Sequence, residues 1–216
     1  MCHEAKQPAN GSMNTFDVKL QNIPLLNLRM EFNSNYLYVR SPHFEEWSKS
    51  KDTPPETQLF VWYGLPDDFI TFLVQRSVLG LEAYVPGAVF TEVGLRGRVT
   101  KKVLNATKNP FALKGKGTVD NCYNLLPSLI DPRFSLKASD TDLWKRQLQF
   151  YEHIRNPIFH GHQFMEWNSD IIRGIFDHLA KIYLWVDSWH NPDNLWPGAS
   201  VFSTNIRSLL NGTSDK

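Results

Sequence analysis

The chain has 216 residues, of which 42% are hydrophobic and 21% are charged, and its formal net charge at pH 7 is +1. A chain of this length can bury a sizeable core, as one large domain or as one domain with a small appendage. The balanced charge excludes a strongly basic chain, so any nucleic-acid contact must come from a local patch. No apolar run of about 18 residues is present, so we expect neither a membrane-spanning helix nor a membrane partner.

Residues 1–14 are polar, and we expect them to form a disordered leader. They contain no apolar central segment, so no secretory signal is predicted. The two cysteines, Cys2 and Cys122, are too few for a disulfide framework. Together these features predict a cytoplasmic protein.

Residues 15–65 predict a small antiparallel β subdomain. Alternation of apolar and polar residues begins at Phe16 and resumes over residues 26–40, which we interpret as a hairpin that turns at Asn33-Ser34-Asn35. Residues 59–63 supply a further strand. A sheet this small needs a larger body to pack against.

Residues 66–191 predict that larger body, a helical bundle. Its first helix begins near Pro66, and the Pro86-Gly87 pair is expected to break it. Two further helices are predicted over residues 89–107 and 118–130.

The fourth and fifth helices of the bundle have the clearest signals. Capping groups over residues 139–142 begin the fourth helix, which places Trp144, Leu148 and Tyr151 on one face. The fifth helix begins at Ser169 and ends before Pro192, and residues 192–216 are expected to form an irregular tail. The predicted fold class is therefore α+β: a predominantly α-helical bundle with a small N-terminal antiparallel β subdomain.

The heptapeptide Arg155-Asn156-Pro157-Ile158-Phe159-His160-Gly161 gathers groups that are able to do chemistry. It resembles the Arg-Asn-x-x-x-His signature of the HEPN superfamily, which comprises helical-bundle proteins found among toxin–antitoxin, abortive-infection and CRISPR-associated ribonucleases. By helix layout the resemblance covers residues 66–190. It implies a cofactor-free endoribonuclease with Arg155, Asn156 and His160 as catalytic residues. It also implies single-stranded or looped RNA as substrate, a 2′,3′-cyclic phosphate product, a homodimer with a composite active site, and an antitoxin or regulatory partner protein.

The residue types suit that chemistry. An imidazole with a pKa near 6.5 can take a proton from a ribose 2′-hydroxyl or give one to the leaving oxygen. A guanidinium forks onto a phosphate, and Asn156 can orient either group. On a straight helix, residues five apart diverge by roughly 140°, so Arg155 and His160 would not share a face. Because Pro157 disfavours a helical residue before it, we expect a kink that brings the three side chains to one rim.

Other interpretations of the same segment stay open. Arg155 could pair with a carboxylate such as Glu152 while His160 caps a helix, as in a non-catalytic module that binds RNA or protein. His160, His162 and Glu166 also reproduce the His-x-His-x-x-x-Glu core of the cupin metal motif, and His153 could join His160 and Glu166 in a helical zinc site. The cupin interpretation requires strands and a second motif, and the chain offers neither here.

A one-sided run of positive charge lies between Glu92 and Asp120. Such a run can follow a phosphate backbone, although charge runs are more often solvated surfaces. The candidate RNA-binding residues are Arg96, Arg98, Lys101, Lys102, Lys108, Lys114 and Lys116.

Overall fold

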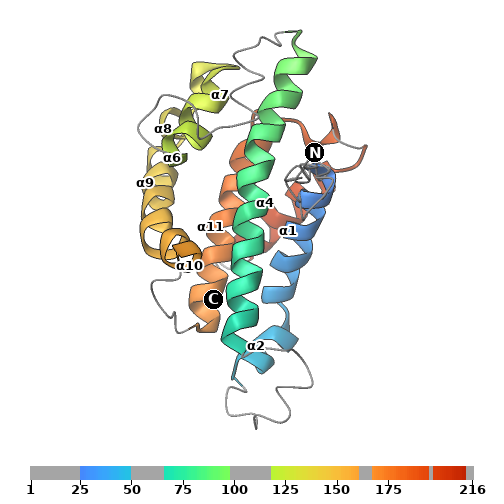
Figure 1. Cartoon of the computed structure of the whole chain (residues 1–216). Coiled ribbons are helices and arrows are strands. Elements are labelled where there is room, and N and C mark those ends of the chain that lie inside the picture. The colour runs from blue at the N-terminus through green and yellow to red at the C-terminus, as the bar shows by residue number, and fades with distance from the viewer. Residues whose placement is uncertain (1–24, 50–65, 98–117, 161–166, 195–196, 213–216) are drawn as a thin grey trace, which may run out of the picture.

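The structure is a computed structural model that describes residues 25–49, 66–97, 118–160, 167–194 and 197–212. Within these ranges the regular elements are all helical (Figure 1). The longer helices are α1 (Leu25–Val39), α2 (Pro42–Lys49), α4 (Pro66–Leu95), α9 (Thr141–Phe150), α11 (Ser169–Asp187) and α12 (Ser200–Asn211). The shorter turns are α6 (Thr118–Asp120), η2 (Asn121–Leu125), α7 (Leu126–Ser128), η3 (Pro132–Phe134), α8 (Leu136–Ser139), η4 (Tyr151–Arg155), α10 (Asn156–His160) and η5 (Pro192–Asn194).

The bundle is arranged around α4. Figure 1 shows α4 along the length of the molecule, with α1 on one side, α6 to α10 on the other, and α11 behind. The helix α1 runs antiparallel to α4, since Leu25 lies beside Gly87 and Glu31 pairs with Arg76. Aromatic side chains fill the space between α1 and α11, where the rings of Phe32 and Tyr183 are 4.3 Å apart.

The prediction of a β hairpin over residues 26–40 is wrong, because this segment is the helix α1. Its apolar residues satisfy two periods at once, and the helical period places the side chains of Leu28, Phe32, Tyr36 and Val39 on one buried face. Among the described residues no strand remains, which removes the N-terminal β subdomain from the fold. The predicted strands at Phe16 and residues 59–63 lie outside the described residues.

The predicted break at Pro86-Gly87 is also wrong, since α4 continues through both residues to Leu95. Pro86 has no N–H to donate to the carbonyl of Glu82, so the helix loses one bond without ending. Packing on both sides compensates: Gly87 lets Leu25 of α1 approach closely, and Val85 and Ala88 are fully buried.

By length and composition alone, Ile70–Leu95 of α4 could cross a membrane, and half of its most apolar window is buried inside the bundle. Its charged residues Arg76, Glu82 and Glu92 are held by partners on neighbouring elements, as expected of the central helix of a bundle.

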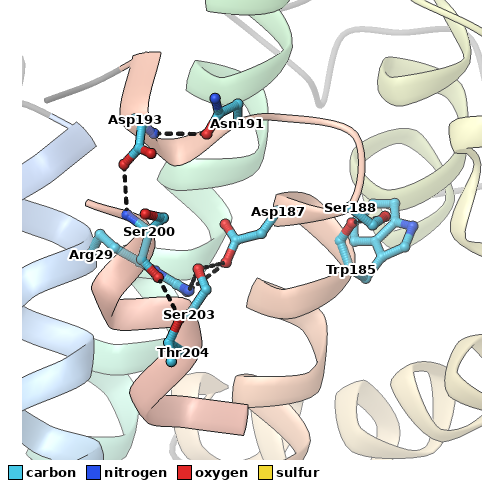
Figure 2. Close-up of polar contacts among 9 residues, drawn as sticks. All are labelled: Arg29, Trp185, Asp187, Ser188, Asn191, Asp193, Ser200, Ser203 and Thr204. Atoms are coloured by element: carbon cyan, nitrogen blue, oxygen red, sulfur yellow. Dashed lines mark hydrogen bonds and ion pairs between the residues drawn. The ribbon is translucent and has the colours of Figure 1, made fainter. Parts of the chain in front are cut away.

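The tail that was expected to be irregular contains the helix α12, and Figure 2 shows how this helix is held. The Ser203 hydroxyl donates to Asp187 Oδ2 at 2.5 Å, and Arg29 Nη2 donates to the same oxygen at 2.5 Å. Ile206 is fully buried, so α12 belongs to the core. Three helices, α1, α11 and α12, therefore meet at one buried ion pair.

The predicted cap of the fourth helix and the predicted start of the fifth helix at Ser169 are confirmed, although the cap of the fifth helix, Asn168, was not predicted. Asp140 accepts a hydrogen bond from the backbone N–H of Leu143 and begins α9, and Asn168 does the same for Ile171 at the start of α11. Leu148, however, is 44% exposed and does not share the buried face of Trp144 and Tyr151.

Candidate functional site

Two π-helical turns shape the candidate site. In η2 the backbone N–H of Leu126 donates to the carbonyl of Asn121, and in η4 the N–H of Asn156 donates to the carbonyl of Tyr151, five residues back in each case. Each donor is followed directly by a proline, Pro127 or Pro157. A proline inside a helix clashes with the carbonyl four residues before it, and a widened turn relieves that clash. The sequence thus places a π turn just before each of these prolines.

The π turn η4 presents Arg155 to the carboxylate of Glu82 on α4. Arg155 Nε donates to Oε1 at 3.1 Å and Nη2 donates to Oε2 at 3.3 Å, which is a bidentate arrangement. The guanidinium also lies over the ring of Phe159, 4.6 Å from its centroid. Burial alone would lower the pKa of Arg155, but the hydrogen bond and charge of Glu82 outweigh it and raise that pKa above its ordinary value.

Two tyrosines extend this pair into the interior. The Tyr151 hydroxyl donates to Glu82 Oε1 at 2.6 Å and lies 3.3 Å from the hydroxyl of Tyr123 on η2. Burial raises the pKa of both phenols well above the ordinary value, so both remain protonated hydrogen-bond donors. The neighbouring Cys122 is also buried, and burial together with the charge of Glu82 raises the pKa of its thiol to about 12. Its thiol is therefore not a nucleophile at neutral pH.

The predicted kink between Arg155 and His160 is wrong. Asn156 has helical angles, φ −64° and ψ −46°, and α10 follows η4 without a break. Arg155 is directed at α4, whereas the side chains of Asn156 and His160 are exposed to solvent. In a single chain the three predicted catalytic residues therefore share one helix end but do not converge on one rim.

The alternative interpretation, in which Arg155 forms an ion pair within the fold, is correct, but the predicted partner is wrong. The guanidinium does pair with a carboxylate, but that carboxylate belongs to Glu82, 73 residues earlier in the chain, and Glu152 is exposed. At the end of the helix the carbonyl of Ile158 accepts a hydrogen bond from Gln75 Nε2 at 3.2 Å, so α4 also holds the last turn of α10.

The metal interpretations are tested only in part. His162 and Glu166 lie outside the described residues, while His153 and His160 are both exposed on the described helix. In the described ranges no three His, Cys, Asp or Glu side chains come together in a way that could hold a metal ion.

Of the predicted RNA-binding residues, the structure describes only Arg96. Its side chain is 40% exposed, Nε lies 3.6 Å from Glu92 Oε2, and the guanidinium lies 5.6 Å from the ring centroid of Phe134. Arg98, Lys101, Lys102, Lys108, Lys114 and Lys116 lie outside the described residues.

Sequence reasoning missed Glu82 and Tyr123, although Glu82 has a signal of its own. It is the sole charged residue between Arg76 and Glu92, in the middle of an apolar run. A carboxylate in such a run is seldom buried without a partner, so it predicts a buried cation or donor. Nothing in the sequence indicates that this partner is Arg155, because the pairing depends on how α10 packs against α4.

The geometry defines a site in which Glu82 and two aromatic rings orient a half-buried guanidinium beside an exposed helix end. A guanidinium held in this way can receive a phosphate on the side that is not occupied by the carboxylate. Comparison with known proteins adds no family to this description: no protein-family model, no curated protein and no solved structure matches the chain.

Proposed function

We propose that the chain is a metal-independent endoribonuclease of the HEPN type that cleaves single-stranded or looped RNA. The observation that carries the proposal is the orientation of Arg155 by Glu82 at the end of the helix that terminates in the exposed His160. A fixed guanidinium and a nearby imidazole are the groups that RNA cleavage without a metal requires.

In the proposed reaction His160 accepts the proton of a ribose 2′-hydroxyl. The 2′-oxygen then forms a bond to phosphorus and the bond from phosphorus to the 5′-oxygen breaks. The departing 5′-oxygen takes a proton from water, and the water recovers the proton that His160 accepted. Arg155 Nη1, which is not one of the two nitrogens bonded to Glu82, binds the phosphate and stabilises its developing charge. Asn156 supports the substrate from the exposed side of the same turn. The products are a 2′,3′-cyclic phosphate and a free 5′-hydroxyl.

The proposed site is a composite of two chains, which fits how one chain presents the two groups. Arg155 pairs with Glu82 on α4, whereas His160 is exposed at the end of the same helical segment. A homodimer can place the His160 of one copy opposite the Arg155 of the other. The proposal includes a cytoplasmic enzyme with a toxin or phage-defence role that is regulated by an antitoxin-like protein.

A second candidate function is RNA or protein binding without cleavage. It is favoured by the same Arg155–Glu82 pair, because two nitrogens of the guanidinium are already satisfied within the fold. In that case Arg155 fixes the position of α10, and the exposed side of the helix makes the contact.

Incubation of labelled structured RNA with the protein in EDTA separates the two functions. The wild type is expected to cleave, and Arg155→Ala and His160→Ala are expected to lose cleavage by about 100-fold or more. His153→Ala is the matched control, since it removes another exposed imidazole from the same helical segment. Intact RNA with retained binding would support the second function, and loss of cleavage in EDTA would contradict the metal-independent mechanism.

A further inference from the structure

The outer face of α4 carries a series of exposed apolar residues between Ile70 and Gly94. The exposed residues between Ile70 and Gly94 are Phe72, Leu79, Ala83, Phe90 and Gly94, and none of them is charged or polar. Phe72 is 60% exposed, Leu79 46% and Phe90 42%. The outer face of a helix in a soluble bundle normally carries charged and polar residues, so this face is suited to a partner.

These residues form one straight strip, which we call the α4 strip. Phe72, Ala83 and Gly94 are eleven residues apart, as are Leu79 and Phe90, and eleven residues make about three helical turns. The strip extends over 22 residues, or roughly 33 Å at about 1.5 Å per residue. Arg76 lies within the strip, 18 residues or about five helical turns before Gly94, and its side chain is 42% exposed, but it pairs with Glu31 at 2.6 Å. Glu82, beside the strip, pairs with Arg155.

We propose that the α4 strip is a self-association surface, on which α4 of a second copy of this chain packs antiparallel. The order of the side chains supports a second copy, since the strip is symmetric about Leu81. Phe72 and Phe90 each lie nine residues from Leu81, and Leu79 and Ala83 each lie two residues from it. A two-fold axis at Leu81 therefore places Phe72 against Phe90 of the second copy and Leu79 against Ala83, a large residue against a small one.

The charges on α4 are compatible with this occupant, and the area of the strip indicates how strong the dimer is. In the antiparallel register Arg76 lies opposite Pro86, so the two arginines do not face each other, and Glu31 already neutralises each of them. A strip of roughly 33 Å by about 10 Å covers less than half of the roughly 800 Å² per partner that a standard interface buries. The flanking helices α1 and α10 must supply the rest, so the dimer is expected to be reversible.

A membrane would also cover an apolar helix, but the contacts of α4 disfavour it. Ion pairs join α4 to Glu31 on α1, Arg155 on η4 and the buried His190 beyond α11. Insertion of α4 into a bilayer would break these pairs and expose the charged partners.

The proposed dimer also brings the candidate site of each copy close to the two-fold axis. Leu81 is adjacent to Glu82, the residue that orients Arg155, so the axis lies beside the Arg155–Glu82 pair of each copy. The composite site of the proposed ribonuclease rests on this dimer, whereas the dimer rests only on the exposed side chains of α4. A dimer that does not cleave RNA would contradict the proposed function alone. A monomer that cleaves RNA would contradict the dimer and its composite site, but not the ribonuclease activity.

Solution mass, measured by sedimentation over a range of concentrations, tests the surface. The wild-type chain of 216 residues is expected to reach twice the chain mass, and Leu79→Glu is expected to remain at the chain mass with an unchanged circular dichroism spectrum. Leu148→Glu on α9 is the matched control, because Leu148 is 44% exposed and lies outside the strip; it should dimerise as the wild type does. A monomeric wild type, a dimeric Leu79→Glu protein, or equal disruption by Leu148→Glu would overturn the proposal.

The register has its own test. Ala83→Lys, a change at an exposed helical position, should also give a monomer, and it keeps the surface testable if Leu79→Glu does not fold. The double variant Leu79→Glu with Ala83→Lys places each glutamate against a lysine of the other copy and should restore the dimer. A double variant that stays monomeric would overturn the antiparallel register.

Discussion

Among the arginines that pair with carboxylates and lie against aromatic rings, Arg29 at the centre of the bundle and Arg155 at its edge differ in their exposure to solvent. At the centre, the side chains of Arg29 and Asp187 are 0% and 2% exposed, and Arg29 lies 4.5 Å from the ring centroid of Tyr183. At the edge, the side chains of Arg155 and Glu82 are 18% and 9% exposed. The two pairs therefore differ in their access to solvent. The central pair fixes helices to one another, and in the proposed function the edge pair also receives a ligand.

The largest effect is expected from breaking the central pair. Arg29→Met leaves Asp187 buried without its cation, and the free energy of unfolding should fall by about 3–5 kcal/mol. Urea denaturation followed by circular dichroism measures the change. The double variant Arg29→Met with Asp187→Leu removes both charges and should recover part of the loss; a single-variant loss below about 1 kcal/mol would remove the distinction between the pairs.

A smaller loss is expected from the edge pair. In Arg155→Met the Glu82 carboxylate keeps its hydrogen bond from Tyr151, so the loss should be about 1–3 kcal/mol. The same denaturation experiment compares the two arginines directly. A loss as large as that of Arg29→Met would show that Arg155 is a structural residue, and would favour binding without cleavage.

A further prediction concerns acid stability and the partly buried imidazole of His178. Burial, followed by the charges of Arg146 and Lys181, lowers the pKa of His178 to about 4 from its ordinary value of 6.5. The unfolded chain therefore binds more protons between these values, and stability falls as pH drops from 6.5 to 4, by at most about 3 kcal/mol.

The measurement is the free energy of unfolding against pH for the wild type and for His178→Gln. Between pH 6.5 and 4 the free energy of unfolding of the variant should depend less steeply on pH, because the variant lacks the one proton that His178 binds on unfolding. Equal slopes would show that other groups, rather than His178, set the acid stability.

The smallest expected effect is on the alkylation rate of Cys122, a buried residue near the Arg155–Glu82 pair. Because the pKa of the Cys122 thiol is raised to about 12, native protein with Cys2→Ser should react slowly with iodoacetamide at pH 8. Mass spectrometry of native and urea-unfolded samples measures the alkylated fraction. Rapid native alkylation would show that solvent enters the space behind Arg155 and Glu82, so that the edge pair is more open than its contacts indicate.

The helices with local signals could be predicted from the sequence. Asp140 and the residues around Ser169 identified the starts of α9 and α11, because capping depends on neighbouring residues alone. The segment that forms α1 fits both the strand and the helix period, and only its packing against α4 and α11 selects the helix. A proline in α4 was taken to end the helix, although buried neighbours hold the helix through it.

The part of the candidate site that depends on neighbouring residues could be predicted from the sequence, and the part that depends on tertiary packing could not. Arg155 and His160 were identified by their spacing in seven residues, which is local information. Glu82 could have been suspected as a lone carboxylate in an apolar run, but its pairing with Arg155 spans the bundle and follows from tertiary packing. The directions of Arg155 and His160 were predicted wrongly, because the π turn before Pro157 absorbs the proline without a kink.

The measurement that tests the central claim most directly identifies the RNA ends that cleavage leaves and asks whether cleavage requires the 2′-hydroxyl. A short labelled RNA is incubated with the protein in EDTA, beside the same RNA with a single 2′-deoxy nucleotide at the cleavage position. The ribonuclease account predicts that the RNA is cut to a 2′,3′-cyclic phosphate by the wild type and not by His160→Ala, and that the 2′-deoxy position resists. An uncut RNA, cleavage at the 2′-deoxy position, or full activity in His160→Ala would contradict it.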